Sequence, residues 1–593
     1  MAALLLLCPA VLRAQWSGSI DVSGGIGGMN SESPYETEPM IHWIGQGIFK
    51  LNYKGEKFTT GTVLDAKWEP KQTDNTRFSY KDQKVGVNYK SSSTKPLTIS
   101  LKQDFAWRPT PLRNYSASLQ YQYKNDRAEN NTVNYAGADS TEKYSYYYEI
   151  PEMDEHKVQA GVKTFRDFGS GKHILQSAFT FKAVTNQKSN TWVVFKSDKA
   201  SKQSTKITTA DNQFIGYAWM YRITPSNTDL SLDGDIRLEN SLADNELKLK
   251  VTPGTRFQYK QLLDQNSGAT FIPEGTEGDG HWQDSTRLRE RFDYLSIQSE
   301  QYVQAGFNWR KVEAHADYAL QVYGRRLNDD EHTQPFRIKG VYPVGKSNVK
   351  WNINAEHSLN LVHQMSVKHP DYLKVCWYDR TAGYLDQLYR GNEQLLSPQT
   401  TQYTLEYAFK KKRFSSKTSI SYKSVINEID QTWSNEEIDG RIYKIFRWLN
   451  SSDSHTAGIV QNLGWEGKVI SSHAEFTYNQ SLRTAINGNK QKKSFDWKLK
   501  ADITARLGNG WSLGMDAKYQ SKTATFFTIF KQYCELNALV QKDFNKFTVY
   551  LKGKDLLDDP RQTSFESEEL NEFWVEEVRN NRRLIVLGLR WKF

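Results

Sequence analysis

The chain repeats one pattern, in which apolar and polar side chains alternate with a period of two. Clear examples occupy residues 115–123, 230–239, 403–410 and 497–506. In the last of these, Trp, Leu, Ala and Ile at odd positions alternate with Lys, Lys, Asp and Arg at even positions. A helix would mix those charges with the apolar residues on one surface, whereas successive side chains of a strand point to opposite faces. The pattern therefore predicts β-strands that each have one apolar and one polar face.

The last predicted strand, residues 582–593, has the most apolar face. Its outward row consists of Ile585, Leu587, Leu589, Trp591 and Phe593. One such strand would fit equally well as a half-buried core element of a soluble sheet. The recurrence of the pattern along the chain, with aromatic residues near the end of the row, favours a strand of a membrane β-barrel. We expect this strand to close the barrel by pairing with residues near Trp16 and with residues 547–554.

Short and long connections alternate between the predicted strands. Tight turns are expected at 53–55, 168–172, 411–413, 507–510 and 543–545. Long polar loops are expected at 125–154, 188–209, 262–292, 326–345, 370–400, 428–453 and 555–581. Short turns at one rim and long loops at the other are typical of outer-membrane barrels, whose long loops face outside.

These elements predict an all-β fold, a large transmembrane antiparallel β-barrel of roughly 22–24 strands. Residues 247–260 leave open whether they form one strand or two short strands around Pro253 and Gly254. We find no change of composition within residues 16–593 that would mark a second domain.

Composition supports a barrel and excludes some other classes. The chain is polar on average, with a mean hydropathy of -0.71, yet it contains 32 Tyr, 28 Phe and 17 Trp. After residue 15 no segment approaches the ~18 consecutive apolar residues of a membrane helix. The net charge of +10 is spread over alternate strand positions, so we expect a charged, solvated interior and no nucleic-acid partner.

Residues 1–15 have the features of a secretory signal peptide. A short apolar stretch precedes Ala14 and Gln15, and it is too short to span a bilayer. The three cysteines, Cys8, Cys376 and Cys534, are too far apart to suggest a disulfide framework or a metal knuckle. The mature chain is therefore expected to begin near residue 16.

The polar rows of the predicted strands supply the candidate lumen-facing residues. These are Asp233, Asp235, Arg237, Lys498, Lys500 and Asp502, each flanked by outward apolar residues. Two acidic clusters with histidine, at 152–156 and 329–332, lack the ligand spacing of a calcium loop, so we expect solvated charges and no metal site. No G-x-S-x-G or H-E-x-x-H motif occurs. We therefore expect no enzyme and no cofactor.

Residues 368–409 resemble the barrel of TonB-dependent outer-membrane receptors of the Bacteroidetes type. Gly391, Asn392, Leu396, Pro398, Thr401 and Tyr403 fit that family, while Glu393 stands where proline is usual. Residues 555–557 resemble the ending of its penultimate strand. The terminus resembles its assembly signal, here Leu589, Trp591 and Phe593. The resemblance implies the Gram-negative outer membrane, with membrane lipid, lipopolysaccharide and the barrel assembly machinery as partners.

Such receptors also carry a globular plug that precedes the barrel. Here strand-like sequence begins at Trp16, and even a small domain needs about 50–100 residues, so we expect no plug. A barrel of this width is too wide for its own side chains to fill. Either long loops fold inward, a plug-like partner fills the lumen, or the pore is open.

Three functions remain compatible with the sequence. The resemblance implies binding or uptake of a nutrient across the outer membrane, with a surface lipoprotein as a candidate partner. A structural or assembly barrel filled by a partner protein, and a passive porin, are the alternatives.

Overall fold

The computed structural model describes residues 15–29, 40–69, 71–81, 84–136, 143–169, 172–197, 217–243, 247–273, 280–284, 290–329, 333–376, 379–381, 387–438, 441–486, 491–524, 528–557, 559, 561–567, 572–580 and 584–592. Most of these residues lie in β-strands, and the single helix among them, α1 (Tyr372–Val375), has four residues. None of the helical structure in these ranges is long and apolar enough to cross a membrane.

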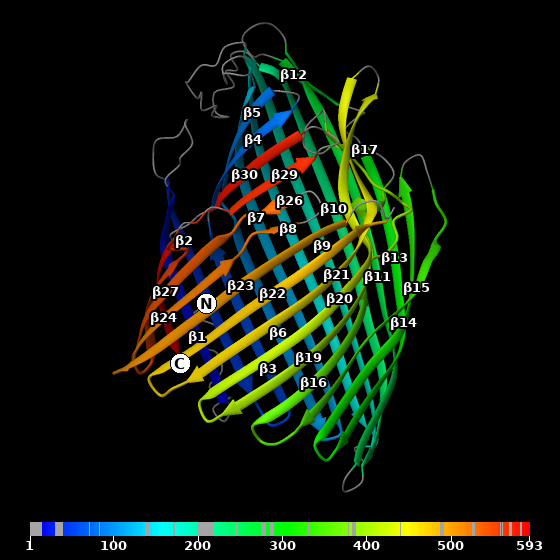
Figure 1. Ribbon diagram of the computed structural model, residues 1–593, viewed down its shortest axis with the longest axis vertical. Coiled ribbons are helices and arrows are strands. Elements are labelled where there is room, and N and C mark those ends of the chain that lie inside the picture. The colour runs from blue at the N-terminus through cyan, green and yellow to red at the C-terminus, as the bar shows by residue number, and fades with distance from the viewer. Residues whose placement is uncertain are drawn as a thin grey trace, which may run out of the picture.

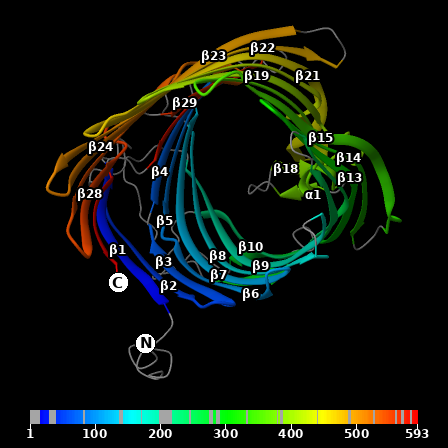
Figure 2. The ribbon, with the colours of Figure 1, turned by 90° about the horizontal axis from the view of Figure 1, so that it is seen from below.

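Twenty-two strands form a closed antiparallel ring, in which each strand pairs with the next and the last pairs with the first (Figures 1 and 2). The ring consists of β1 (Gln15–Met29), β2 (Met40–Lys54), β3 (Phe58–Trp68), β6 (Leu97–Thr110), β7 (Arg113–Ala136), β8 (Lys143–Asp167), β9 (His173–Ser197), β10 (Tyr217–Ala243), β11 (Leu247–Pro273), β13 (Glu290–Trp309), β14 (Val312–Asp329), β15 (Arg337–Asn352), β16 (His357–Val367), β19 (Gln399–Lys411), β20 (Phe414–Ile438), β21 (Arg441–Glu466), β22 (Ile470–Ala485), β23 (Gln491–Gly508), β24 (Trp511–Gln520), β27 (Tyr533–Asp543), β28 (Phe547–Lys554) and β31 (Leu584–Lys592). The strand number lies at the lower end of the predicted range.

The ring closes where the sequence predicted it. Trp591 of β31 lies opposite Ile20 of β1 on one side and opposite Phe547 of β28 on the other. Closure leaves no edge strand in the ring, so every backbone donor and acceptor along the wall has a partner strand. The predicted pairing of the last strand is confirmed.

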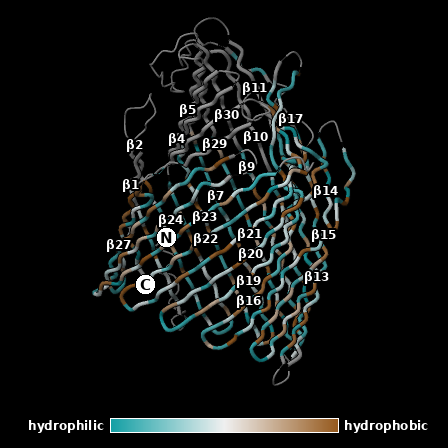
Figure 3. The backbone as a smooth tube through the Cα atoms, viewed as in Figure 1, coloured by the Kyte–Doolittle hydropathy of each residue, from teal (hydrophilic) through white to brown (hydrophobic). Residues whose placement is uncertain are grey.

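The outer surface of the ring is apolar. Large apolar side chains on alternate positions point outward and are exposed, as Leu320 on β14 is at 59%. Figure 3 shows hydrophobic and hydrophilic residues alternating along the strands. Exposed aromatic residues follow the rim of short turns and recur further along the strands: Trp107, Tyr115, Trp309, Trp351, Trp465 and Trp511 near the turns, and Tyr121, Tyr318, Tyr403, Tyr422 and Tyr478 beyond them. An apolar band between two aromatic belts is the arrangement of a barrel that spans a membrane.

The long connections differ from the prediction, because much of their length continues as strand. Residues 125–154 and 428–453 form extended hairpins of β7 with β8 and of β20 with β21. Further strands in the long connections are β4 (Lys71–Lys81), β5 (Lys84–Thr94), β12 (Gly280–Asp284), β25 (Thr523–Ala524), β26 (Thr528–Phe530), β29 (Arg561–Ser567) and β30 (Glu572–Asn580). β4 pairs with β30, and β5 pairs with β7. Alternation arises where one face of a strand meets lipid, so strands that extend beyond the membrane need not show it.

Candidate functional site

One long connection folds into the barrel. Residues 368–398, which join β16 to β19, contain α1 and the short strands β17 (Asp379–Thr381) and β18 (Gln387–Arg390). Figure 2 shows α1 and β18 within the outline of the ring. We call the described residues of this stretch the inward segment. Of the three possibilities for the lumen that the sequence left open, inward folding of a loop is the one seen in this connection.

A cluster of buried apolar side chains holds the inward segment against the wall. Val375 and Cys376 at the end of α1 are fully buried against Phe292 and Leu327, which are 0% and 2% exposed. Leu262, Tyr294 and Leu395 complete the cluster. Burying a large apolar side chain contributes about 1.5–3 kcal/mol. The segment is therefore docked by a small hydrophobic core inside the barrel.

His369 joins the inward segment to β14 through its ring. The ring stacks on Tyr323, with centroids 3.6 Å apart and planes 4° apart. Its Nε2 lies 2.7 Å from Gln321 Oε1, and its Nδ1 lies 2.9 Å from Ser397 Oγ. Burial, with a smaller effect of the Arg325 charge, lowers the pKa of His369 to about 4. The imidazole is therefore neutral at pH 7, and one of its nitrogens donates while the other accepts.

Two polar side chains of the wall bind the backbone of the inward segment. Arg325 on β14 donates from Nη2 to the carbonyl of Glu393 at 2.5 Å. Asn450 on β21 accepts from the Leu396 amide at 2.9 Å and donates to its carbonyl at 3.1 Å. The side-chain amide of Asn450 also donates to the Asn427 carbonyl at 2.8 Å. Further along, β18 pairs in parallel with β21.

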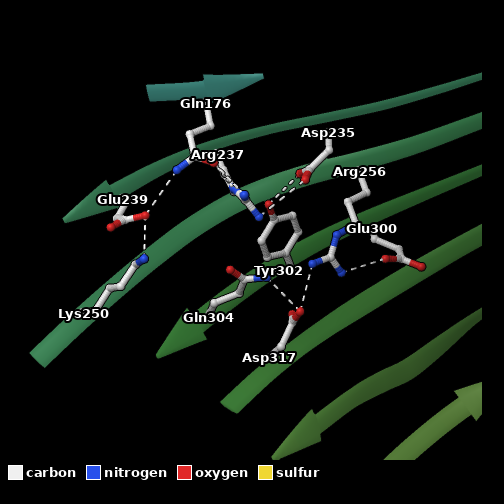
Figure 4. A network of polar contacts seen from close by, with 10 residues as sticks. All are labelled: Gln176, Asp235, Arg237, Glu239, Lys250, Arg256, Glu300, Tyr302, Gln304 and Asp317. Atoms are coloured by element: carbon white, nitrogen blue, oxygen red, sulfur yellow. Dashed lines mark hydrogen bonds and ion pairs between the residues drawn. The ribbon is translucent and has the colours of Figure 1, made fainter. Parts of the chain in front are cut away.

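A network of charged and polar residues lines the wall next to the inward segment (Figure 4). We call it the polar wall: Gln176, Asp235, Arg237, Glu239, Lys250, Arg256, Glu300, Tyr302, Gln304 and Asp317. Asp317 accepts from Arg256 Nη2 and from Gln304 Nε2, both at 2.9 Å. The guanidinium carbon of Arg256 lies 3.9 Å from the ring centroid of Tyr302, and the Tyr302 hydroxyl donates to Asp235 Oδ1 at 2.6 Å.

The polar wall and the inward segment form one continuous network. Glu300 accepts from Gln321 Nε2 at 2.6 Å, and Gln321 also contacts His369. At the other end, Arg237 donates to Gln176 at 2.6 Å, and Lys250 pairs with Glu239 at 2.6 Å. Because Asp317 and Gln321 lie four residues apart on one strand, they share a face. Gln321 contacts His369 of the inward segment, so this face of β14, and with it the polar wall, belongs to the inner surface of the ring.

Gly254 creates the space for the central residue of this network. It lies opposite Tyr302 in the pairing of β11 with β13. A Cβ at this position would lie 2.4 Å from both Cζ and the hydroxyl oxygen of Tyr302. Without that carbon, the ring crosses β11 and reaches Asp235 on β10. Residues 247–260 form part of the single strand β11, which settles the alternative left open by the sequence.

The structure brings three of the six predicted lumen-facing residues together. Asp235 and Arg237 belong to the polar wall, and Asp233 next to them accepts from Gln258 Nε2 at 2.8 Å. The other three lie on β23, which Figure 2 places across the ring from β9 and β10. There Lys500 pairs with Glu475 at 2.7 Å and Asp502 lies 3.5 Å from His473. Lys498 shares their face of the strand, opposite the exposed Trp497 and Leu499.

The predicted assembly signal lies only partly in the described chain. Leu589 and Trp591 are 48% and 45% exposed on the outer surface. Phe593 and residues 1–14 of the predicted leader lie outside the described residues, and Gln15 is the first residue of β1. In the described part of the chain, no three His, Cys, Asp or Glu side chains are close enough to hold a metal ion.

Sequence reasoning missed the central residues of the polar wall and the residues that hold the inward segment. Arg256, Tyr302 and Asp317 occupy polar rows that alternation could have revealed, but nothing in the sequence pairs them. His369 and Asn450 carry no local signal, because their partners lie 48 and 54 residues away in the chain.

A cavity of about 750 Å³ opens between the inward segment and β21. Arg390, Asn392, Glu393, Arg447 and Trp448 contribute to its lining. Arg390 Nη1 lies 2.8 Å from Glu436 Oε2, and Arg447 binds the other oxygen of the same carboxylate. Both guanidinium groups are therefore held in place by one carboxylate.

Comparison with known proteins identifies similarities at two levels. Residues 259–591 match the outer membrane protein beta-barrel family. No curated protein matches the chain by sequence. Among solved structures, the unliganded ferric citrate transporter FecA is 10% identical, with a TM-score of 0.60 over 97% of this chain and 78% of that one. The copper transporter OprC is 9% identical, with a TM-score of 0.61 over 98% and 81%. The siderophore receptor PirA from Pseudomonas aeruginosa is 12% identical, with a TM-score of 0.53 over 98% and 80%. At such low identity these likenesses describe the fold.

Proposed function

Because the chain belongs to the outer membrane protein beta-barrel family, we propose that this integral outer-membrane barrel takes part in the binding and uptake of a nutrient. In this proposal, the inward segment narrows the lumen, and the cavity on its surface receives the nutrient. The similar structures named above are a ferric citrate transporter, a copper transporter and a siderophore receptor. These likenesses support transport in general terms and leave the nutrient unspecified.

The observation that carries the proposal is the docking of the inward segment inside the ring. A passive pore needs no loop tied to its inner wall by a hydrophobic core, a stacked histidine and two side chains that bind its backbone. The adjoining cavity, at about 750 Å³, lies within the ~300–1,000 Å³ range of small-molecule sites. Arg390 and Arg447, both held by Glu436, provide placed polar groups of the kind that such sites use.

Several residue roles follow from this proposal. Asp233, Asp235, Arg237, Lys498, Lys500 and Asp502 would border the aqueous lumen. Leu589, Trp591 and Phe593 would be read by the barrel assembly machinery, and residues 1–15 would be removed on export. The resemblance of residues 368–409 to TonB-dependent receptors of the Bacteroidetes type supports a surface lipoprotein as a partner of the long hairpins.

Conductance in planar bilayers tests the proposal. We expect purified wild-type protein to give little current in KCl. A variant in which a short Gly-Ser linker replaces residues 370–396 should form a pore with several-fold higher conductance, because the linker cannot occupy the lumen. Liposomes containing that variant should admit the trisaccharide raffinose, whereas wild-type liposomes should not.

A variant that shortens the β20–β21 hairpin tip, residues 437–442, is the matched control, since it removes a loop outside the inward segment. It should behave as the wild type does. A large, steady ohmic current from wild-type protein would contradict the proposal and favour a passive porin. Silence of both the wild type and the linker variant would favour a structural barrel filled by something else.

A further inference from the structure

A second cavity lies where the ring closes. It has a volume of about 320 Å³ and is lined by residues of β1, β2 and β3 on one side and of β27, β28 and β31 on the other. We call it the seam cavity. Its strands turn apolar residues outward: Val22, Leu551 and Leu589 are 54%, 47% and 48% exposed. The alternate residues Ser23, Lys552 and Arg590, which line the seam cavity, therefore face inward.

Positive charge dominates the lining of the seam cavity. Lys67, Lys552, Lys554 and Arg590 contribute four cations, whereas Glu69 is the one carboxylate among the lining residues. These cations come from β3, β28 and β31, so closure of the ring brings together charges that lie up to 523 positions apart (67 to 590).

The carboxylates around the seam cavity already have partners. Glu69 pairs with Lys67. Asp21 accepts from Arg590 Nε at 2.7 Å and from the Tyr550 hydroxyl at 3.4 Å. Asp65, behind the lining, accepts from Gln46 Nε2 at 3.1 Å. These contacts fix the positions of Arg590, Tyr550 and Gln46.

Lys552 is the cation in the seam cavity without a counter-charge. It is half-buried, and it forms no hydrogen bond or ion pair with the part of the chain that the structure describes. Some cations elsewhere on the inner surface are paired with carboxylates. Arg256 has both Asp317 and Glu300, and Lys500 has Glu475. A surplus of cations in a concave site with low-dielectric walls concentrates the field and attracts anions.

We propose that the seam cavity binds a small multivalent oxyanion, either a phosphate or a polycarboxylate. Lysine ammonium groups bind such groups as point charges, and bonds from a charged donor to a charged acceptor are roughly twice as strong as neutral ones. The Ser23 hydroxyl, which also lines the cavity, supplies a neutral donor. A volume of about 320 Å³ is at the lower end of the ~300–1,000 Å³ range of small-molecule sites. This property goes beyond the proposed uptake function and does not require transport.

Isothermal titration calorimetry on the purified full chain tests the proposal, with pyrophosphate and tricarballylate as probes and glycerol as the neutral comparison. We expect at least one of the two anions to bind and glycerol not to bind. The anion that binds identifies the source of the oxyanion as phosphate or carboxylate. Raising KCl from 50 to 300 mM should weaken binding, because salt screens charge interactions.

Two substitutions locate the site. K552Q and K67Q should each raise the dissociation constant about tenfold or more, because each removes a charged donor from the lining of the cavity. K500Q is the matched control: it removes an inward lysine that already has a carboxylate partner and lies on β23. It should leave binding within about twofold of wild type. All three variants should keep the heat-modifiable gel mobility of a folded barrel.

Failure of both anions to bind would overturn the proposal, as would equal binding of glycerol. Loss of binding in K500Q to the same extent as in K552Q would also overturn it, because the charge of the whole lumen would then explain the affinity. These outcomes are independent of the conductance test. A segment-dependent current without anion binding would reject the seam cavity alone.

Discussion

Leu327 provides a sharp test of whether the inward segment is docked by its hydrophobic cluster. The residue lies on the inner face of β14, is 2% exposed and packs in the cluster with Phe292, Val375 and Cys376. Leu320 lies on the same strand, points outward and is 59% exposed. The substitutions L327A and L320A therefore remove the same atoms from opposite faces of one strand.

The expected size of the effect follows from the burial of Leu327. Replacing a buried leucine by alanine costs about 2.7–5 kcal/mol, from lost transfer energy and the cavity left behind. The ring persists whether the segment is docked or released, so this cost falls on the docking equilibrium. Each ~1.4 kcal/mol changes an equilibrium constant tenfold, so the released population should rise roughly 100-fold to 4,000-fold.

The chain contains its own reporter of release. Cys376 is 0% exposed in the docked segment and belongs to the same cluster. With Cys8 and Cys534 replaced by alanine, a maleimide can react only with this thiol. Where docking is fast compared with labelling, the labelling rate is proportional to the released population. The rate should therefore rise about 100-fold or more in L327A and stay within about twofold of the parent in L320A.

Labelling of L327A at the parent rate would refute the role of the cluster in docking. Equal acceleration in L327A and L320A would also refute it, because the whole of β14 would then have been destabilised. A heat-modifiability gel run on each variant reports the state of the ring separately.

Three further results are expected. G254A should destabilise the barrel by about 1–3 kcal/mol, because the new Cβ would lie 2.4 Å from the Tyr302 ring. The midpoint temperature of heat modification should therefore fall. G47A is the control, since its Cβ would have no atom within 4 Å, and it should leave the midpoint unchanged. Acidification should release the inward segment, because the lowered pKa of His369 means that docking favours the neutral imidazole. The contribution of His369 to docking is complete above about pH 6.5, the ordinary pKa of histidine, and it falls as the pH drops toward 4. Labelling of Cys376 at pH 5, normalised to urea-unfolded protein at that pH, should therefore exceed labelling at pH 7.5. Persistence of the same pH effect in H369Q would contradict the role of His369. Deletion of Phe593 should leave the protein unassembled in the periplasm, and normal amounts of heat-modifiable barrel in the outer membrane would show that this residue is dispensable.

The alternation of side chains was enough to predict most of the ring. The period of two is local, because it depends only on which face of a strand meets lipid and which meets water. It identified strands such as 497–506, the outward row that ends in Leu589 and Trp591, and the closing pairs of β31 with β1 and β28. The turn positions near 412 and 509 also agree with the structure, and both Lys412 and Asn509 adopt positive φ there.

The sequence also predicted part of the candidate site. Asp235 and Arg237 were assigned to an inward row, and they contribute to the polar wall. Their partners were not predictable, because Tyr302 reaches Asp235 across an intervening strand only where Gly254 leaves room. Cross-strand contacts depend on register, and register is a property of the assembled sheet.

The tertiary structure alone decided which loops extend as hairpins, which segment folds into the barrel and which charged residues share a cavity. Polar loops at 125–154 and 428–453 extend as hairpins because backbone pairing needs no apolar pattern in water. Residues 368–398 turn inward because Val375 and Cys376 meet Phe292 and Leu327, which lie 48–84 positions earlier in the chain (375 − 327 and 376 − 292). Lys67 and Lys552 share a cavity because the ring closes between them. Alternation records the solvent on each side of a strand, whereas these contacts depend on which distant strands the closed ring brings together.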